Sequence, residues 1–143
     1  MNTLNVLVVD DNRVARAMVV RALRTSGLPF GDVKEAENGR EALDMLKRTA
    51  FDLALVDIHM PSMSGDQLIA TLRQQPETSK LPVIAVSSDV SPALNSFLRE
   101  HDVPRVAKPF EPEELRTLIV ARTGIAEDAN EPGTIVDDSE LDF

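Results

Sequence analysis

The sequence predicts an α/β fold: a doubly wound, five-stranded parallel sheet of order 2-1-3-4-5, built as (βα)5. Two observations predict this fold class. Short apolar runs without alternation indicate strands that are buried on both faces, as in a parallel sheet between two layers of helices. Segments with helical periodicity separate these runs. The chain therefore consists of five repeats of a strand followed by a helix.

The expected strands differ in polarity. The runs of apolar residues at 4–9, 53–56 and 83–86 are almost continuous, and a shorter run covers 106–107. A further strand at 33–36 is weaker and more polar, which is typical of a strand at the edge of a sheet. With five strands in the common order, strands 1, 3, 4 and 5 lie side by side.

The expected helices have recognisable faces and starts. In the first helix, Val14, Ala17, Met18 and Ala22 are spaced to lie on one face, and the pattern fades before Gly27. Later helices carry start signals of two kinds. Capping-box pairs are Asn38 with Glu41 and Ser64 with Gln67, and prolines at the first helical position are Pro92 and Pro112. The last helix has an apolar face formed by Leu115, Leu118 and Ile119.

Length and charge bound the organisation of the chain. The 143 residues suit one compact domain, which we expect at 1–123, followed by an acidic, flexible tail at 124–143. Seven of the 24 acidic residues and no basic residue lie in this tail, which leaves 17 acidic against 15 basic residues before it. Neither part offers the basic face that nucleic-acid binding requires. We therefore expect no nucleic-acid partner.

Composition also excludes several classes of protein. No apolar run approaches the ~20 residues that cross a bilayer, and the first residues lack the basic flank of a signal peptide. We expect no membrane contact and a cytoplasmic location. The chain has no cysteine, which excludes disulfides, thiolate catalysis and cysteine metal sites.

Polar residues end four of the expected strands. They are Asp10, Asp57, Ser87 and Lys108, and Asp11 follows Asp10 directly. Ligands bind at the carboxyl ends of the strands in an open parallel sheet, and neighbouring strands are ~4.8 Å apart, so these side chains should converge. Two carboxylates at ~4 Å repel each other by about 4 kcal/mol at an effective dielectric near 20. A divalent cation relieves this repulsion, and an all-oxygen site suits Mg²⁺, with Mn²⁺ as a possible substitute.

With a cation in place, this patch suits phosphoryl transfer. A phosphoryl group needs a nucleophile, a cation and donors for its outer oxygens. Asp57 is central and can attack as a carboxylate, while Lys108 and the Ser87 hydroxyl can hold the other oxygens. Serine is short and has to move toward the phosphoryl group, and that movement would give a two-state signal.

Four motifs together resemble the receiver domains of bacterial two-component response regulators, of the stand-alone chemotaxis-regulator type. The motifs are Val-Leu-Val-Val-Asp-Asp-Asn from Val6, Asp57-Ile58-His59-Met60-Pro61 followed by Gly65, Val86-Ser87, and Lys108-Pro109-Phe110. Their spacing is similar to that of the family from about Leu4 to Arg122. Each motif alone is weak, but all four in order, each ending a predicted strand, are specific. The resemblance implies a flavodoxin-like fold.

The resemblance also implies residue roles. Asp57 would be the phosphoacceptor, Ser87 the switch hydroxyl and Lys108 the phosphate-binding cation, with a cis peptide before Pro109. The ligands of Mg²⁺ would be Asp10, Asp11, Asp57 and the backbone carbonyl of His59. The implied donor is a phosphohistidine on a sensor histidine kinase or phosphotransfer protein, and the output is an unknown downstream protein. Such a domain is a monomer or weak dimer and not an enzyme, beyond its own phosphotransfer and dephosphorylation.

The sequence departs from the family near the fifth strand. Many members carry an aromatic residue three positions before the lysine, where this chain has Arg105. Signalling would then use a salt bridge of Arg105 or a loop movement. The small turn that usually precedes this strand is replaced by His101-Asp102-Val103-Pro104. His59 and Asp89 adjoin the site and either tune the access of hydrolytic water or are ordinary loop residues.

Several alternatives remain open from the sequence. The chain is a stand-alone receiver, or it is a receiver excised from a longer response regulator or hybrid protein whose output domain is absent. A flavodoxin-like cofactor binder would need a phosphate loop where Asp10 and Asp11 stand. An aspartyl phosphatase would need a second aspartate at position 59. A degenerate scaffold is disfavoured because every phosphorylation residue is present.

Overall fold

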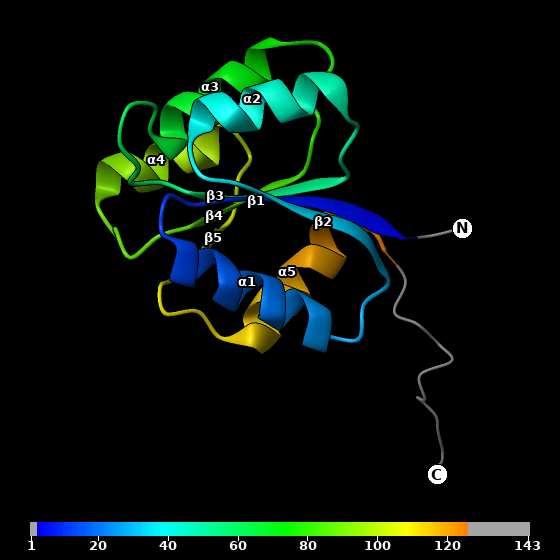
Figure 1. The fold of residues 1–143 in the computed structure, drawn as a ribbon. Helices are drawn as coiled ribbons and strands as arrows, with labels where there is room; N and C mark the ends of the chain where they lie inside the picture. The colour runs from blue at the N-terminus through cyan, green and yellow to red at the C-terminus, as the bar shows by residue number, and fades with distance from the viewer. Residues whose placement is uncertain (1–2, 126–143) are drawn as a thin grey trace, which may run out of the picture.

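The computed structural model describes residues 3–125 and confirms the predicted fold. Five strands form one parallel sheet in the order β2-β1-β3-β4-β5. The strands are β1 (Leu4–Val9), β2 (Phe30–Ala36), β3 (Leu53–Asp57), β4 (Val83–Val86) and β5 (Arg105–Val106). The helices are α1 (Arg13–Thr25), α2 (Gly39–Arg48), α3 (Gly65–Gln74), α4 (Pro92–Glu100) and α5 (Pro112–Thr123). Helices α1 and α5 cover one face of the sheet, and α2, α3 and α4 cover the other (Figure 1).

The central strands are apolar because helices cover both of their faces. Alternate residues of β1 enter different hydrophobic clusters: Leu7 packs with the side of α2, α3 and α4, and Val8 packs with the side of α1 and α5. All five residues of β3 and all four of β4 are buried. This two-sided burial explains the apolar runs without alternation. β2 is an edge strand, as predicted, but begins at Phe30, three residues before the expected start.

The helix starts largely follow the predicted caps. Ser64 and Gln67 form the complete capping box of α3. Asn38 caps α2 by accepting the N–H of Glu41, but the Glu41 carboxylate accepts the N–H of Glu37 and not that of Asn38. Pro92 and Pro112 begin α4 and α5. These caps fix where each helix leaves the carboxyl end of a strand, where the site lies.

The predicted face of α1 is wrong for three of its four residues. Ala22 is buried, but Val14, Ala17 and Met18 are exposed, Val14 by 68% and Met18 by 55%. The residues that pack on the sheet are Val19, Ala22 and Leu23. The helix has two overlapping apolar stripes, and the sequence pattern did not say which of them faces the sheet.

Two further predictions concern the ends of the chain and membranes. The acidic tail expected at 124–143 lies outside the described residues from 126 onward. α5 ends at Gly124, which has a left-handed backbone (φ 72°), and Ile125 is buried against the core. Among residues 3–125, no helix combines the length and apolar character needed to span a bilayer.

Candidate functional site

The strand register brings the predicted aspartates together. Val9 of β1 pairs with Val56 of β3, so the next residues, Asp10 and Asp57, stand level on adjacent strands. Ser87 follows Val86, which pairs with Asp57 on the other side. Asp10, Asp57 and Ser87 are buried polar residues at the ends of strands whose buried side chains are aliphatic. The predicted convergence at the carboxyl edge is therefore present.

Lys108 links the two buried aspartates. Its Nζ lies 3.0 Å from Asp10 Oδ2 and 3.0 Å from Asp57 Oδ1. Asp10 also accepts the N–H of Asn12 on Oδ1 at 2.9 Å. Both carboxylate oxygens of Asp10 thus have donors, while one lysine serves two buried carboxylates.

The electrostatic balance of the site disfavours a fully ionised Asp57. Burial raises the pKa of Asp57, and the nearby Asp10 and Asp11 add to this increase, against the lowering effect of Lys108. Burial acts to lower the pKa of Lys108, but its hydrogen bonds to Asp10 and Asp57 outweigh burial and leave that pKa raised. The single charge of Lys108 therefore does not fully compensate the negative charge of the neighbouring carboxylates.

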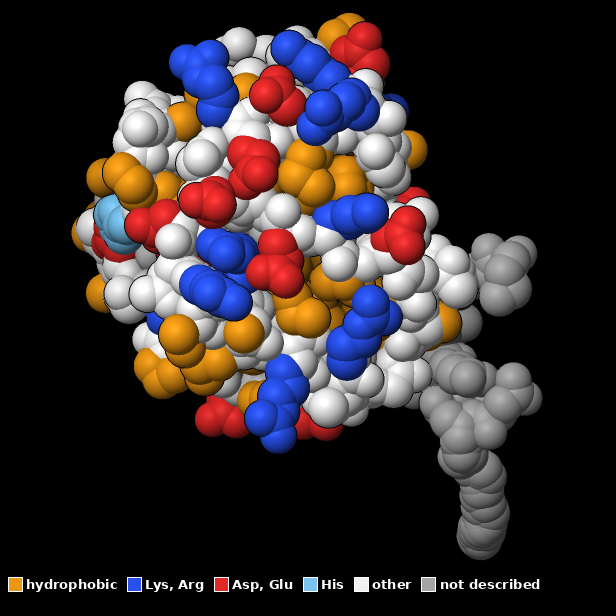
Figure 2. Space-filling model, viewed as in Figure 1, with side chains coloured by type: hydrophobic (Ala, Val, Ile, Leu, Met, Phe, Trp, Pro, Cys, Tyr) orange, Lys and Arg blue, Asp and Glu red, His pale blue; other side chains and the backbone are white. Residues whose placement is uncertain are grey.

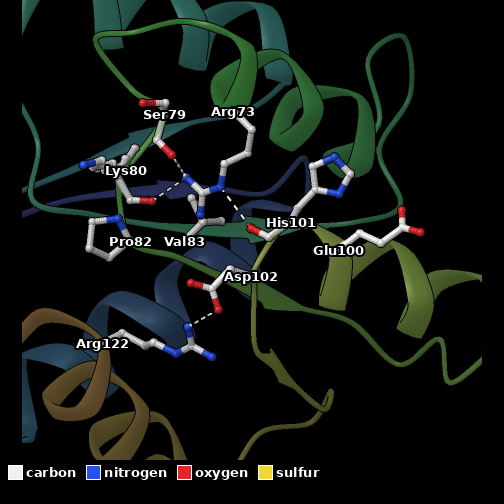
Figure 3. A pocket seen from close by; sticks show the side chains of 10 residues that line it. Arg73, Ser79, Lys80, Pro82, Val83, Glu100, His101, Asp102 and Arg122 are labelled. Atoms are coloured by element: carbon white, nitrogen blue, oxygen red, sulfur yellow. Dashed lines mark hydrogen bonds and ion pairs between the residues drawn. The ribbon is translucent and has the colours of Figure 1, made fainter.

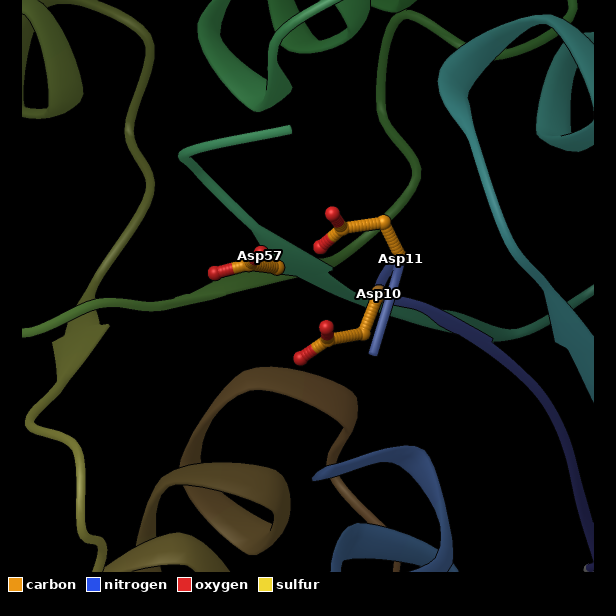
Figure 4. Close-up of side chains that lie close together, drawn as sticks. All are labelled: Asp10, Asp11 and Asp57. Atoms are coloured by element: carbon orange, nitrogen blue, oxygen red, sulfur yellow. The ribbon is translucent and has the colours of Figure 1, made fainter. Parts of the chain in front are cut away.

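The geometry fits a divalent cation. Asp10, Asp11 and Asp57 each place one carboxylate oxygen within 4.8 Å of the others. The three side chains project in the same direction from the ends of β1 and β3 (Figure 4). Within residues 3–125, neither Asp57 Oδ2 nor the exposed Asp11 carboxylate has a hydrogen-bond donor. These oxygens provide the hard, anionic ligand set that Mg²⁺ prefers.

A tight turn after β3 shapes the rim of the site. The Gly65 N–H donates to the Ile58 carbonyl at 2.7 Å, which folds the loop back on the strand. A Cβ at Gly65 would clash with the carbonyl oxygen of Asp57. Within the described chain, no donor reaches the carbonyl of His59, the predicted backbone ligand. A substitution at Gly65 would therefore displace the backbone of Asp57.

His59 and Asp89 form a bridge across the mouth of the site. His59 Nε2 lies 2.9 Å from Asp89 Oδ2, which joins the loop after β3 to the loop after β4. The N–H of Asp89 donates to Ser87 Oγ at 3.0 Å, and Asp89 Oδ1 accepts the N–H of Ser91. That backbone hydrogen bond from Ser91, followed by the contact with His59, lowers the pKa of Asp89. The Ser87 hydroxyl is thus engaged with the backbone of Asp89.

Arg105 contacts the backbone of Ser87. Its Nη1 donates to the Ser87 carbonyl at 2.9 Å, and Arg105 forms no ion pair with any of residues 3–125. Signalling through a salt bridge of Arg105 or a loop movement stays a prediction. The Ser87 N–H donates to Val106, so β5 holds both backbone groups of Ser87. The Lys108–Pro109 peptide is cis, as predicted.

One supporting residue was missed in the sequence. Arg16 donates from Nη1 to the backbone carbonyl of Asp10 at 2.7 Å and from Nε to Glu35 at 2.9 Å. No sequence pattern marked Arg16, because its partner at the site is a backbone carbonyl. Arg16 does not compensate the Asp10 carboxylate directly, but it fixes the end of β1.

Comparison with known proteins places the chain among signalling domains. The family model described as "Response regulator receiver domain" matches residues 6–120. The chain is 36% identical over 86 residues to chemotaxis protein CheY-3 of Vibrio cholerae, covering 60% of this chain and 65% of that protein. It is 34% identical over 120 residues to two-component response regulator ORR41 of Oryza sativa, covering 81% and 91% respectively.

Solved structures have the same architecture. A putative response regulator from Chloroflexus aurantiacus superposes with a TM-score of 0.78 at 28% identity, covering 85% of this chain and 98% of that one. Chemotaxis protein CheY4 of Vibrio cholerae gives 0.75 at 29% identity, covering 84% and 98%. Other relatives are much longer: the chain spans 14% of sensor histidine kinase CheAY of Helicobacter pylori and 11% of the gliding motility regulatory protein of Myxococcus xanthus.

Proposed function

The chain belongs to the response regulator receiver domain family, and from this premise we propose that it accepts a phosphoryl group on Asp57 in a Mg²⁺-dependent reaction. The observation that carries the proposal is the position of Asp57. It is a buried carboxylate with one oxygen on Lys108 and the other without a donor among residues 3–125, beside Asp10 and Asp11. Its own phosphotransfer and dephosphorylation would be its only chemistry.

The proposed reaction is a displacement at phosphorus. The bond between the phosphoryl group and a histidine nitrogen of the donor breaks, a bond from Asp57 Oδ to phosphorus forms, and the leaving imidazole keeps the electron pair and takes a proton. The product is an acyl phosphate on Asp57. Lys108 Nζ and the Ser87 hydroxyl are the donors that would hold the transferred oxygens.

The metal would be held by carboxylates and one carbonyl. Asp10, Asp11, Asp57 and the backbone carbonyl of His59 are the proposed ligands of Mg²⁺, and Mn²⁺ could replace it. Bound there, the ion would neutralise the charge that develops on the phosphoryl oxygens. Lys108 is already committed to Asp10 and Asp57, which supports the need for additional positive charge.

The proposed switch is the movement of Ser87. Its hydroxyl accepts the N–H of Asp89, so turning toward a phosphoryl group would break that contact and disturb the bridge to His59. Arg105 would sense the same movement through the Ser87 carbonyl. Pro109 would keep Lys108 oriented into the site.

The donor protein would dock beside Lys108. A hollow of about 330 Å³ there is lined by the exposed Val14 and Met18 of α1 together with Pro109 and Phe110. Exposed apolar side chains next to the phosphoacceptor support docking of a sensor histidine kinase or phosphotransfer protein.

Several further expectations stay predictions. They are the downstream protein, the cytoplasmic location, the monomeric or weakly dimeric state and the lack of membrane or nucleic-acid partners. The expected lack of a nucleic-acid partner agrees with the viewed face of the molecule, where basic side chains are interspersed with acidic ones (Figure 2).

A second candidate is a receiver domain that works within a longer protein. It is favoured by relatives in which the matching segment is 11%, 14% or 23% of the whole chain. The two candidates share the chemistry at Asp57 and differ in the output. The reading frame around the gene for this chain distinguishes them.

The proposed function is tested with phosphoramidate, whose P–N bond resembles that of phosphohistidine. Incubation with Mg²⁺ should add the mass of one phosphoryl group to the intact protein, and EDTA should prevent the addition. Asp57→Asn should give no adduct, whereas Asp44→Asn, which removes an exposed carboxylate of α2, should react like the wild type. An adduct that forms equally well in EDTA would overturn the metal-dependent mechanism.

A further inference from the structure

A groove lined by arginines runs along the edge of the sheet near α5. It has a volume of about 280 Å³ and lies between α4, the start of β5 and the end of α5. Its basic side chains are Arg99, Arg105 and Arg122, and among residues 3–125 Asp102 is the one acidic residue that lines it. Its apolar floor includes Leu98 and Val103, which are buried. The groove therefore combines positive charge with an apolar base.

The positive charge of this groove is only partly compensated. Arg122 pairs with Asp102 at 2.8 Å (Figure 3). Arg105 donates to the neutral carbonyl of Ser87, and the exposed Arg99 makes no ion pair within the described part of the chain. Two of the three guanidinium groups thus have no carboxylate partner among residues 3–125, and arginine forms strong charge-assisted hydrogen bonds with carboxylates.

The chain itself carries a segment of matching chemistry. Residues 127–142 contain all seven acidic residues of the tail and no base, and Ile135, Val136 and Leu141 lie among them. The segment starts four residues after Thr123, the end of α5, and Arg122 at that end lines the groove. Ile125 is buried and so fixes the point from which the segment departs.

We propose that the acidic segment 127–142 binds in the groove formed by α4, β5 and α5, with its carboxylates on Arg99 and Arg105. The segment is tethered next to the groove, and a flexible chain of this length spans roughly 22 Å on average, so its effective concentration there is of millimolar order. The carboxylate cluster offers no alternative, because Asp10, Asp11 and Asp57 repel an acidic segment. In the neighbouring hollow, Arg73 already donates to the carbonyls of His101 and Leu81. A free acidic partner lacks the advantage of the tether.

The consequence is an intramolecular block. A downstream protein that recognises this groove through carboxylates has to displace the segment. Arg105 also holds the carbonyl of Ser87, so occupation of the groove and the position of the switch serine are linked through one side chain. By thermodynamic reciprocity, each affects the other.

The chain has no cysteine, which allows a single nitroxide label on the full chain through Ser139→Cys. In ¹H–¹⁵N spectra at low salt, we expect loss of signal for the backbone amides of Asn95, Arg99 and Arg105. The signals should recover after reduction of the nitroxide and in roughly 1 M salt, where the screening length is about 3 Å. The combined variant Arg99→Gln/Arg105→Gln should lose the effect, and Arg48→Gln, at the exposed end of α2, should keep it.

Two further outcomes decide the proposal. Uniform or absent broadening at low salt would overturn intramolecular binding and leave the groove for a separate acidic partner. Broadening centred on other amides would overturn the assignment to this groove. Removing four of the seven negative charges of the segment by Asp137→Asn, Asp138→Asn, Glu140→Gln and Asp142→Asn changes no residue of the described domain and should shift the same groove amides as high salt does. None of these readouts depends on phosphorylation.

Discussion

The two ends of the parallel sheet differ in how their buried charged side chains are compensated. At the carboxyl end, Asp10 and Asp57 are buried to 3% and 6% exposure and share the single cation Lys108. At the amino end of β4, the half-buried Arg73 donates to the carbonyls of His101 at 3.0 Å and Leu81 at 2.7 Å (Figure 3). Its Nη1 also reaches the carbonyls of Thr78 and Ser79.

The comparison distinguishes Arg73, whose charge stabilises the fold, from Asp57, whose charge we assign to function. Burial lowers the pKa of Arg73, but backbone dipoles from two loops surround it, and Asp102 acts in the opposite direction. Burial raises the pKa of Asp57, and its neighbours Asp10 and Asp11 increase that shift. At the amino end, backbone carbonyls of the described chain surround the charge, whereas we propose that Mg²⁺ completes the carboxyl end. Such sites cost stability when the ligand is absent.

The largest effect on stability is expected at the amino end. Arg73→Leu leaves several carbonyls without a donor and should lower the free energy of unfolding by about 3 kcal/mol, measured by urea denaturation. Affinity for Mg²⁺ should stay unchanged because the site lies at the other end of the sheet. Arg48→Leu is the control and should change stability little. A loss below about 1 kcal/mol for Arg73→Leu would show that water replaces the guanidinium without cost.

A somewhat smaller effect is expected from the metal. Mg²⁺ at a hundred times its dissociation constant should stabilise the wild type by about 2.7 kcal/mol, since it binds only the folded state. Asp10→Asn should remove most of this gain, and Asp44→Asn should keep it. Denaturation with and without EDTA measures both. Equal stabilisation of all three proteins would indicate that Mg²⁺ binds elsewhere.

The smallest effect is expected from neutralising Asp57, the proposed nucleophile. In EDTA at pH 7, Asp57→Asn should be more stable than the wild type by on the order of 1 kcal/mol. The folded pKa of Asp57 is raised, so the folded state binds the proton more tightly than the unfolded state, and the wild type loses stability as pH rises through that range. The advantage of the variant should shrink as pH falls toward the unfolded value of ~3.9. An advantage that is independent of pH would contradict this origin.

The strands and the main site residues were predictable from the sequence, but the packing of α1 and the partners of three arginines were not. The apolar runs that end in Asp10, Asp57, Ser87 and Lys108 reveal both the strands and their common edge, because the carboxyl ends of these strands lie side by side in the common order of such sheets. The exposed side of α1 was not predictable from periodicity, since Met18 and Val19 extend two overlapping apolar stripes. The partners of Arg16, Arg73 and Arg105 were also hidden. All three bind backbone carbonyls, which every residue carries and no sequence pattern marks.

The central claim is that Asp57, among the three clustered carboxylates, takes the phosphoryl group. The most direct test is to phosphorylate the wild type with acetyl phosphate and Mg²⁺, reduce the acyl phosphate with borohydride and map the peptides by mass. Reduction converts a phosphorylated aspartate into homoserine and leaves free carboxylates unchanged. Our account predicts homoserine at position 57 alone. Homoserine at position 10 or 11, or none in a protein that has gained a phosphoryl group, would contradict it.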